Sequence, residues 1–350
     1  MTALLFITVV LAWGFTWFAI KLQLGVVAPE ISIFWRFALA TALIWTGLAG
    51  AGRLQRVHWR QHGWFAAMGI CLFCLNYILT YAAIGHIASG VASVIFTMVT
   101  VFNPLNQWLF RGQRPSRRVL AAALLGMVGI ILLFGDTFAG IAVDAGSALG
   151  VALQLASAFV FSLGNLASLR ATASGTDLAN AVARAMSWGT VFLAAFGLAR
   201  GAAFAIDPSP AYLLSLVYLA VVGTIAAFLA YLSLVRRLGA DRAAYVTVLY
   251  PVVALAVSSA FEAYRWSAWS IMGLALVGLG DIVLFAPLPL RRSAATRSIR
   301  LCGLLAITEA MRRPSWKAEW RERSAEHECL IAGQPRTILD PGTTQEAPTS

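Results

Sequence analysis

Apolar residues fall into ten long runs along this chain, separated by short polar connections. A bilayer core about 30 Å thick is crossed by roughly 20 apolar residues in helical form, because hydrocarbon offers no partner to an unpaired backbone group. The runs have about that length, so the pattern predicts an all-α integral membrane protein with ten transmembrane helices. Their expected bounds are 2–20, 31–50, 63–82, 89–110, 117–135, 147–169, 178–199, 211–234, 242–261 and 267–286.

The basic residues between the runs alternate in a way that predicts the orientation. Before the tail, eleven arginines follow the even-numbered runs, whereas the connections after odd-numbered runs hold Lys21, Arg200 and Arg265. Lys and Arg favour the cytoplasmic side of a membrane. We therefore expect both termini in the cytoplasm. No basic segment precedes the first run, so we expect it to be a retained helix and not a signal peptide.

Composition supports this interpretation. The chain has 350 residues, of which 60% are hydrophobic and 12% are charged, with a mean hydropathy of +0.78. A soluble domain has about 25% charged residues, which it needs to cover its surface. The net charge of +11 is spread between the apolar runs and forms no patch, so it does not predict nucleic-acid binding. We expect a multi-pass protein of a bacterial inner (plasma) membrane.

Residues 291–350 have a different composition. They contain ten Lys or Arg and seven Asp or Glu residues, and they hold no apolar run long enough to span a bilayer. Such a composition is typical of disordered segments. We expect a cytoplasmic tail without structure of its own.

Similar patterns recur in the two halves of the apolar region. The segment Trp13-Gly14-Phe15-Thr16 precedes the basic Lys21, and Phe161-Ser162-Leu163-Gly164-Asn165 precedes the basic Arg170. Pro104 and Pro251 each lie in a Thr-containing run, and a glycine follows each proline by 22 residues. Two five-helix repeats, 1–135 and 136–290, explain this pattern. Because five is odd, the repeats would be inserted in opposite orientations, as in many transporters. Chance similarity between apolar helices is the alternative.

The chain resembles the EamA-type family of the drug/metabolite transporter superfamily over residues 3–286. The matching segments are Trp13-Gly14 with Lys21, Pro29 with Arg36, Tyr81-Ala82-Ala83, Gly90-Val91-Ala92-Ser93, Tyr218 to Thr224, and Tyr250-Pro251-Val252-Val253-Ala254 through Phe261-Glu262. This resemblance implies an inverted-repeat carrier that works without ATP. It also implies a midplane cavity lined by helices 1, 3, 4, 6, 8 and 9.

Three basic residues near or inside the runs are candidates for binding an anionic group. Lys21 and Arg36 would lie toward the outer ends of the first two helices and together could attract a carboxylate or phosphate. A charge at the centre of a membrane helix costs at least about 2.5–3.5 kcal/mol, so it normally faces a cavity or a partner. The alternative for Lys21, Arg36 and Arg184 is that the side chain snorkels to the headgroups.

Uncharged polar residues and a Trp-Gly pair complete the candidate substrate site. With Arg36, the predicted substrate-binding residues are Trp13, Gly14, Thr16, Asn76, Tyr77, Thr97, Asn103, Asn165 and Tyr250. Such side chains can hydrogen-bond a zwitterion, or they can bond a neighbouring helix for about 0.6 kcal/mol on average. Pro104 and Pro251 interrupt backbone hydrogen bonding and are predicted hinges, with tighter packing as the alternative.

Other chemistry has little support in the sequence. Cys71-x-x-Cys74 lies in an apolar run without a second ligand pair, which favours packing over a metal site. Glu262 and Asp281 lie near helix ends, so proton coupling has no strong support, and we expect Glu262 to be paired with Arg265. No catalytic arrangement or phosphate-binding loop is present. We therefore expect no enzyme activity, no metal and no cofactor.

The sequence thus favours a secondary transporter, and more specifically an exporter, of small polar metabolites such as amino acids or related amphiphilic compounds. Its expected partners are the small-molecule substrate and the lipid bilayer, with no nucleic acid, and a homodimer is left open. A lipid or lipid-headgroup flippase of the same fold and a non-transporting membrane assembly protein are the alternatives.

Overall fold

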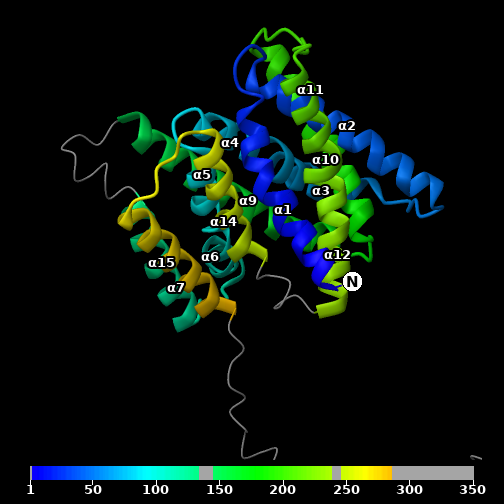
Figure 1. Cartoon of the computed structure of the whole chain (residues 1–350). Coiled ribbons are helices and arrows are strands. Elements are labelled where there is room, and N and C mark those ends of the chain that lie inside the picture. The colour runs from blue at the N-terminus through cyan, green and yellow to red at the C-terminus, as the bar shows by residue number, and fades with distance from the viewer. Residues whose placement is uncertain (1, 134–144, 239–245, 286–350) are drawn as a thin grey trace, which may run out of the picture. The chain divides into compact units, whose positions relative to one another are not determined.

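The computed structural model describes residues 2–133, 145–238 and 246–285, and all regular structure in these residues is helical. They belong to one compact unit (Figure 1). The predicted tail 291–350, the connection 134–144 and the first residues of the ninth predicted run, 242–245, lie outside the described residues.

Helices occupy each of the ten apolar runs within the described residues. The third run is continuous through η1, α3, η2 and α4, the fourth divides into α5 and α6, and the eighth is continuous through α11, η3 and α12. The bounds are α1 Thr2–Lys21, α2 Pro29–Gly50, η1 Trp59–Gln61, α3 His62–Gly69, η2 Ile70–Leu75, α4 Asn76–Ile84, α5 Ser89–Phe96, α6 Val99–Arg111, α7 Arg117–Leu133, α9 Ala145–Ala171, α10 Leu178–Ala199, α11 Pro210–Val217, η3 Tyr218–Ala226, α12 Ala227–Leu238, α14 Val246–Phe261 and α15 Ala268–Phe285.

Local signals set several of these ends. Pro29 and Pro210 stand in the first turns of α2 and α11, where a missing N–H costs no intrahelical hydrogen bond. Ser209 caps α11, since its hydroxyl accepts a hydrogen bond from the Tyr212 amide. Gly112 ends α6 in the left-handed conformation, with φ of 69°, which glycine adopts without steric cost.

The distribution of polar and apolar side chains is that of a membrane protein. Six helical segments in the described residues are long and apolar enough to cross a bilayer, and shorter apolar helices accompany them. Large apolar side chains point outward, among them Leu124 at 67% and Leu214 at 71% exposed, while the amide of Gln154 is completely buried. An outer surface of this kind is stable in lipid, so the chain is a multi-pass membrane protein.

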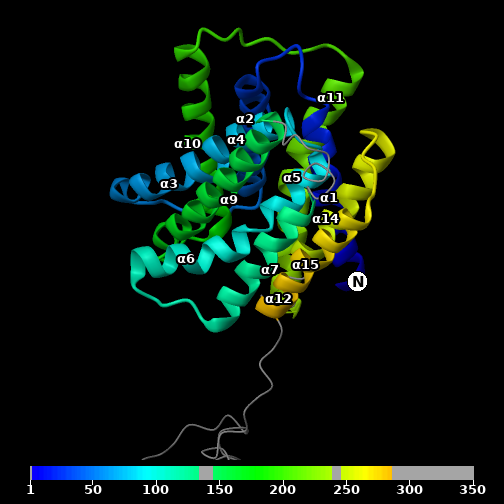
Figure 2. The ribbon, with the colours of Figure 1, turned by 90° about the vertical axis from the view of Figure 1, so that its left-hand side faces the viewer.

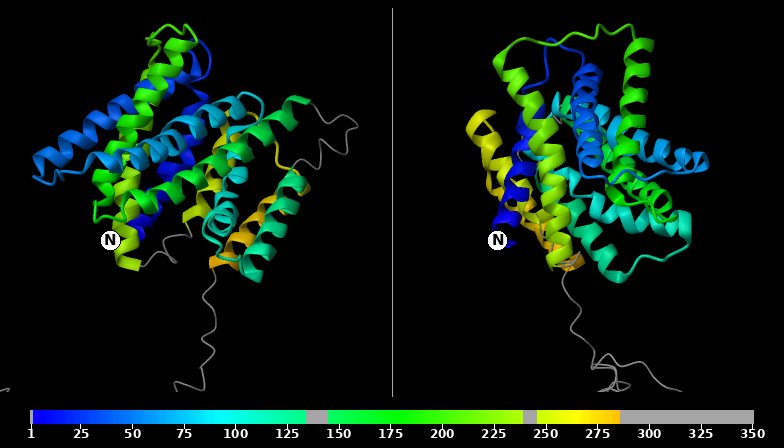
Figure 3. Two further views of the ribbon diagram at one scale, coloured as in Figure 1. Left: turned by 180° about the vertical axis from the view of Figure 1, so that it is seen from behind. Right: turned by 90° about the vertical axis from the view of Figure 1, so that its right-hand side faces the viewer.

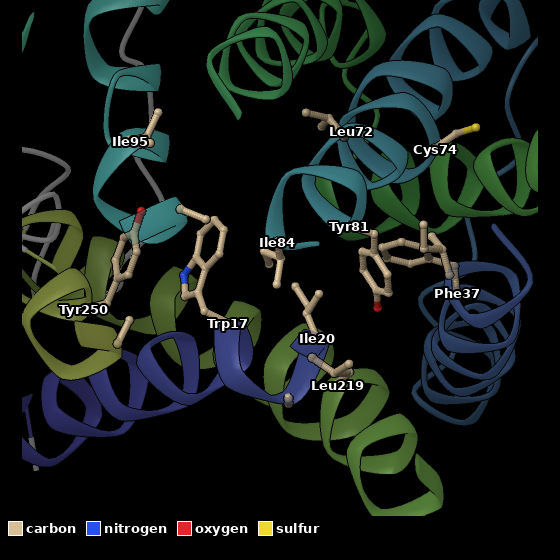
Figure 4. Packing of buried hydrophobic residues seen from close by; sticks show 14 of the residues in the cluster. Trp17, Ile20, Phe37, Leu72, Cys74, Tyr81, Ile84, Ile95, Leu219 and Tyr250 are labelled. Carbon is tan, nitrogen blue, oxygen red and sulfur yellow. The ribbon is translucent and has the colours of Figure 1, made fainter. Parts of the chain in front are cut away.

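Aromatic and aliphatic side chains from both halves of the chain meet in the core (Figure 4). Trp17 of α1 stacks on Tyr250 of α14, with ring centroids 6.4 Å apart and an interplanar angle of 8°. Ile20 and Leu219 bring α1 and η3 into the same cluster, next to Ile84 at the end of α4. The first helix therefore packs mainly against helices of the second half.

Helices α2 and α10 run antiparallel beside each other (Figure 3). Arg53, just after α2, lies 3.6 Å from Asp177 at the start of α10, while Arg200, just after α10, lies 3.5 Å from Glu30 in the first turn of α2. Both arginines are exposed, so solvent screens each pair and its contribution is about 0–1 kcal/mol. The two pairs mainly define the arrangement of the helices. At each end, an arginine just after one helix lies beside an acid at the start of the other helix.

Helices α7 and α15 cross at two glycines, and they lie side by side in Figures 1 and 2. A Cβ atom on Gly273 would lie 2.6 Å from the carbonyl oxygen of Gly129, and one on Gly129 would lie 2.7 Å from the carbonyl oxygen of Gly273. The two backbones therefore approach as closely as hydrogen-sized side chains allow.

The crossing makes a matched pair of substitutions informative. Gly273→Ala would place a methyl group against the backbone of α7, whereas Gly278→Ala in the same helix would meet only Val248 Cγ1, 3.7 Å away. We expect Gly273→Ala to lower the free energy of unfolding by about 1–3 kcal/mol through overpacking. Gly278→Ala, with the same change in helix propensity, should leave it unchanged or raise it. Thermal unfolding in detergent measures both, and equal effects would contradict the close crossing.

Candidate functional site

Arg36 occupies the interior of the bundle. It lies in α2, and its side chain is 1% exposed. Its Nη2 donates to the Tyr77 hydroxyl at 3.4 Å and to Thr224 Oγ1 at 3.3 Å, and its guanidinium carbon lies 4.6 Å from the centroid of the Tyr77 ring. Three helical runs, the second, third and eighth, therefore meet at one positive charge. The snorkelling alternative for Arg36 is wrong, because the side chain points into the bundle.

The charge on Arg36 is not neutralised by the described part of the chain. Its Nε and Nη1 atoms are buried without a hydrogen-bond partner. The ion pairs within the described residues join Arg53 to Asp177 and Arg200 to Glu30. Burying an unpaired charge is costly in an apolar environment. A group outside the described residues, such as a ligand, would therefore gain strongly from binding here.

π-Helical segments lie in both runs that contact this arginine. Thr224 lies within η3, and Tyr77 is the second residue of α4, which begins where η2 ends. The Thr224 hydroxyl donates to the carbonyl oxygen of Leu219, five residues earlier, at 2.7 Å. π-Helical segments are rare and often occur at functional sites, since the extra residue in the turn redirects side chains and loosens the backbone ladder. The same irregularity therefore borders Arg36 from the third and the eighth run.

A second unpaired donor lies among the residues that surround Arg36. The Tyr81 hydroxyl, which interacts electrostatically with Arg36, donates to Gln23 Oε1 at 2.6 Å. Gln23 is buried in the turn after α1, and its Nε2 has no partner. Figure 4 shows Tyr81 next to Phe37, the neighbour of Arg36 in α2. The cluster thus offers several buried N–H groups to a hydrogen-bond acceptor.

The other two candidate cations are satisfied within the chain. Lys21 Nζ donates to the carbonyl oxygen of Ile84 at 3.1 Å, at the C-terminus of α4, where a positive charge is stabilised by the helix dipole. Arg184 donates to the Asn180 carbonyl at 3.0 Å and also bonds to the carbonyl of Gln55. It is only 8% exposed, so the snorkelling interpretation of Arg184 is wrong. Of these three side chains, only Arg36 has buried nitrogens without a hydrogen-bond partner.

The predicted residues of α1 and α14 form an aromatic seam. Trp13 lies edge-on to Tyr250, with centroids 6.4 Å apart, and also contacts Tyr231. Gly14 packs so closely against α14 that an added Cβ would lie 2.5 Å from Val253 Cγ1. The Thr16 hydroxyl donates to a carbonyl of its own helix at 2.8 Å. These contacts assign helix packing to Gly14 and connect Trp13 with Tyr250, but none of them reaches Arg36.

The predicted amides lie in α4, α6 and α9. Asn165 Nδ2 of α9 donates to Asn103 Oδ1 of α6 at 3.2 Å, so the structure pairs two of the predicted residues. Asn76 is buried beside Tyr77, and its Oδ1 has no partner. Gln154 is likewise buried with both amide atoms unpaired. The described interior of the bundle therefore holds unpaired acceptors as well as the unpaired donors of Arg36 and Gln23.

The helix irregularities do not coincide with the prolines. α6 is helical through Pro104, and α14 is helical through Pro251. The fourth run is interrupted at Thr97 and Met98, where α5 ends and α6 begins. There the Thr97 hydroxyl donates to the Val94 carbonyl at 2.7 Å. The hinge at each proline stays a prediction.

Glu262 and Asp281 make contacts that the sequence did not predict. The Glu262 carboxylate accepts hydrogen bonds from the Ser89 amide, at 3.0 Å, and from the Ser89 hydroxyl at the first turn of α5. It caps that helix and is not paired with Arg265, contrary to the expectation. Asp281 is buried and contacts Thr100 in the middle of the fourth run.

Several residues of the site were missed from the sequence. Thr224 was part of a recognised motif but was not assigned a role, Asp281 was placed near a helix end, and Gln23 was not singled out. The sequence does not show whether a small polar residue in an apolar run faces a buried arginine on another helix or faces solvent.

Cys71 and Cys74 are free cysteines on η2, and the described residues contain no group of three or more potential metal ligands.

Comparison with known proteins defines the class first. Two relatives are described as uncharacterized transporters. YvbV of Bacillus subtilis is 27% identical over 79% of this chain and 88% of its own length, and a protein of Archaeoglobus fulgidus is 23% identical over 77% and 92%. One crystal structure matches with a TM-score of 0.56 at 20% identity, over 81% of this chain and 95% of that chain, which shows a common fold.

The chain belongs to the EamA-like transporter family, whose model matches residues 1–135 and 148–286. It is therefore a membrane transporter and not an enzyme. The two matched stretches fit a two-repeat architecture.

The two buried arginines provide a test of this site. Arg184→Met removes a guanidinium whose hydrogen bonds are made, so we expect the free energy of unfolding to fall by about 2 kcal/mol. Arg36→Met removes a charge with two unpaired nitrogens and should leave stability unchanged or raise it, as observed when buried charges are replaced by apolar side chains. Thermal unfolding in detergent compares the two. A fall for Arg36→Met as large as for Arg184→Met would show that Arg36 is paired in the free protein.

Proposed function

We propose that this chain is a secondary transporter that exports small polar metabolites bearing a carboxylate, such as amino acids, across the inner membrane. The observation that carries this proposal is the buried Arg36, whose Nε and Nη1 have no partner and whose Nη2 contacts η3 and the start of α4. A transporter must bind its solute reversibly in the membrane interior. A buried site whose hydrogen bonds are completed only by the solute is suited to such binding.

The chemistry of the unpaired groups favours a zwitterion. A guanidinium forms strong, charge-assisted hydrogen bonds with a carboxylate. The unpaired Nε2 of Gln23 adds another donor, while Asn76 Oδ1 and Gln154 Oε1 are unpaired acceptors that an ammonium group would satisfy. An amino acid carries both kinds of group. An anionic lipid headgroup could bind the Arg36 guanidinium in the same way. The transport assay below distinguishes a lipid substrate from an amino acid.

Symmetry within the bundle supports alternating access between two inverted repeats. π-Helical segments occur in the third and in the eighth run, and these runs are equivalent members of the two five-helix units, 1–135 and 136–290. The ion pairs at the two ends of α2 and α10 exchange places under the same relation. We infer ten crossings with both termini in the cytoplasm, and a cycle in which the two units rock about Arg36.

Transport measurements test the role of Arg36 directly. Vesicles or cells containing the chain would be screened for export of a panel of amino acids, each compared with the amine that lacks its carboxylate. Loss of a charge-assisted hydrogen bond is worth about 1.5–3 kcal/mol, so Arg36→Gln should reduce transport of the amino acid by about 10- to 100-fold. The amine should be transported poorly by both proteins.

The control variant is Arg265→Gln, which removes an exposed arginine in the connection between α14 and α15. It should transport like the unaltered protein. Equal transport by Arg36→Gln and the unaltered protein, or transfer of a fluorescent phospholipid in place of amino acids, would refute the proposed substrate class.

Cysteine labelling tests the proposed topology. In a variant without the four native cysteines, Arg114→Cys after the fourth run and Asp207→Cys after the seventh run would each be exposed to a membrane-impermeant maleimide. We expect labelling of intact cells at position 207 and not at position 114, because basic connections favour the cytoplasm. Labelling at position 114 from outside would reverse the orientation, and labelling of both positions would rule out the crossing count.

A further inference from the structure

Asp281 is a second buried charge-bearing group, away from Arg36. It lies in α15 and is 5% exposed. Its Oδ1 lies 2.9 Å from the Thr100 hydroxyl oxygen, and its Oδ2 is buried without a hydrogen-bond partner. Thr100 belongs to the first turn of α6, directly after the interruption of the fourth run at Thr97 and Met98. One carboxyl group therefore touches the most irregular part of that run.

The hydrogen-bond geometry around Thr100 depends on a proton. Its hydroxyl oxygen lies 2.9 Å from Asp281 Oδ1 and 2.8 Å from the carbonyl oxygen of Thr97. A hydroxyl has one hydrogen, and a carbonyl oxygen can only accept. If Thr100 donates to the Thr97 carbonyl, the contact with Asp281 is a hydrogen bond only when the carboxyl carries a proton and donates it. If Asp281 is ionised, Thr100 must turn and donate to the carboxylate.

Within the described residues, no charged or titratable group near α15 forms an ion pair with Asp281. The ion pairs in these residues join Arg53 to Asp177 and Arg200 to Glu30. Tyr250 of α14 is close enough to interact electrostatically with Asp281, but its hydroxyl donates to the Ser93 carbonyl at 3.5 Å. The charged residues on the neighbouring helices α6 and α7 are Arg111, at the end of α6, and Arg117 and Arg118, at the start of α7.

We propose that Asp281 and Thr100 form a proton-binding site. In the protonated state, the Asp281 O–H donates to Thr100 Oγ1, whose own hydrogen goes to the Thr97 carbonyl, so both contacts are satisfied and no charge is buried. Release of the proton to water leaves a carboxylate that takes the Thr100 hydrogen bond away from Thr97. The ligand is the proton itself, exchanged with water, and no bond other than O–H is made or broken.

This site would link protonation to the shape of the fourth run. The Thr97 carbonyl accepts from both the amide and the hydroxyl of Thr100, at 2.9 and 2.8 Å, and the hydroxyl bond is lost on deprotonation. Because α6 also carries Asn103, which bonds to α9, a change at its first turn would reach the helix contacts of the proposed transport pathway. The proposal is independent of the substrate, and it adds a proton to the transport cycle.

Infrared difference spectroscopy of the full chain in proteoliposomes tests the site without a known substrate. As the pH is raised from mildly acidic to mildly alkaline, the carbonyl-stretch band of a buried protonated carboxylic acid should decrease in the unaltered protein. Asp281→Asn, whose amide can still donate to Thr100, should remove that band. Thr100→Val, which keeps the side-chain shape without the hydroxyl, should shift the band to higher frequency, because the acid loses its acceptor.

Glu262→Gln is the control for another carboxylate at a helix contact, one that is only partly buried, and it should leave the band in place. The proposal is overturned if the unaltered protein shows no such pH-dependent band, or if Asp281→Asn retains it. Should Asp281→Asn fail to fold, Thr100→Val still decides, since an unchanged frequency would exclude the Asp281–Thr100 hydrogen bond. Absence of amino-acid transport would refute the proposed substrate class and leave this result untouched.

Discussion

Hydrocarbon provides no hydrogen bonds, so each polar group inside this bundle depends on another part of the chain or on a ligand. Most of them find a partner across helices. Arg184 bonds to two backbone carbonyls, and Glu262 accepts from the first turn of α5. Asn103 and Asn165 bond to each other. Several buried atoms of the described residues nevertheless lack a hydrogen-bond partner. Among the charged residues that form no ion pair there, these atoms belong to Arg36 and Asp281, which a purely structural role does not explain.

The exceptions lie next to the irregular backbone. Arg36 is bordered by η2 and η3, and Asp281 contacts the residue that follows the interruption between α5 and α6. Elsewhere the helices are regular and tightly packed, most closely where Gly129 meets Gly273. Rigid contacts of this kind allow groups of helices to move as units, whereas π-helical segments and helix interruptions provide places where the backbone can adjust.

Much of the architecture follows from local properties of the sequence. Apolar runs of about 20 residues, with basic connections between them, predict membrane helices because the cost of polar groups in lipid acts on every crossing separately. The helices indeed fall in the predicted runs within the described residues, and the family resemblance is confirmed. Arg36 could be selected from the sequence alone, since a charge inside an apolar run is expensive wherever it points. The Asn103 and Asn165 candidates were found for a similar reason.

Only the tertiary structure shows which residues these side chains contact. Arg36 meets Thr224, and Asp281 meets Thr100, across 188 and 181 positions of the chain, and these contacts depend on how each helix is rotated about its axis. The π-helical turns in η2 and η3 change that rotation without any Gly or Pro signal common to both. The sequence by itself determined which segments enter the membrane, because that choice depends on composition. The tertiary structure decided which buried polar groups are satisfied and which remain open, because that depends on the register and rotation of packed helices.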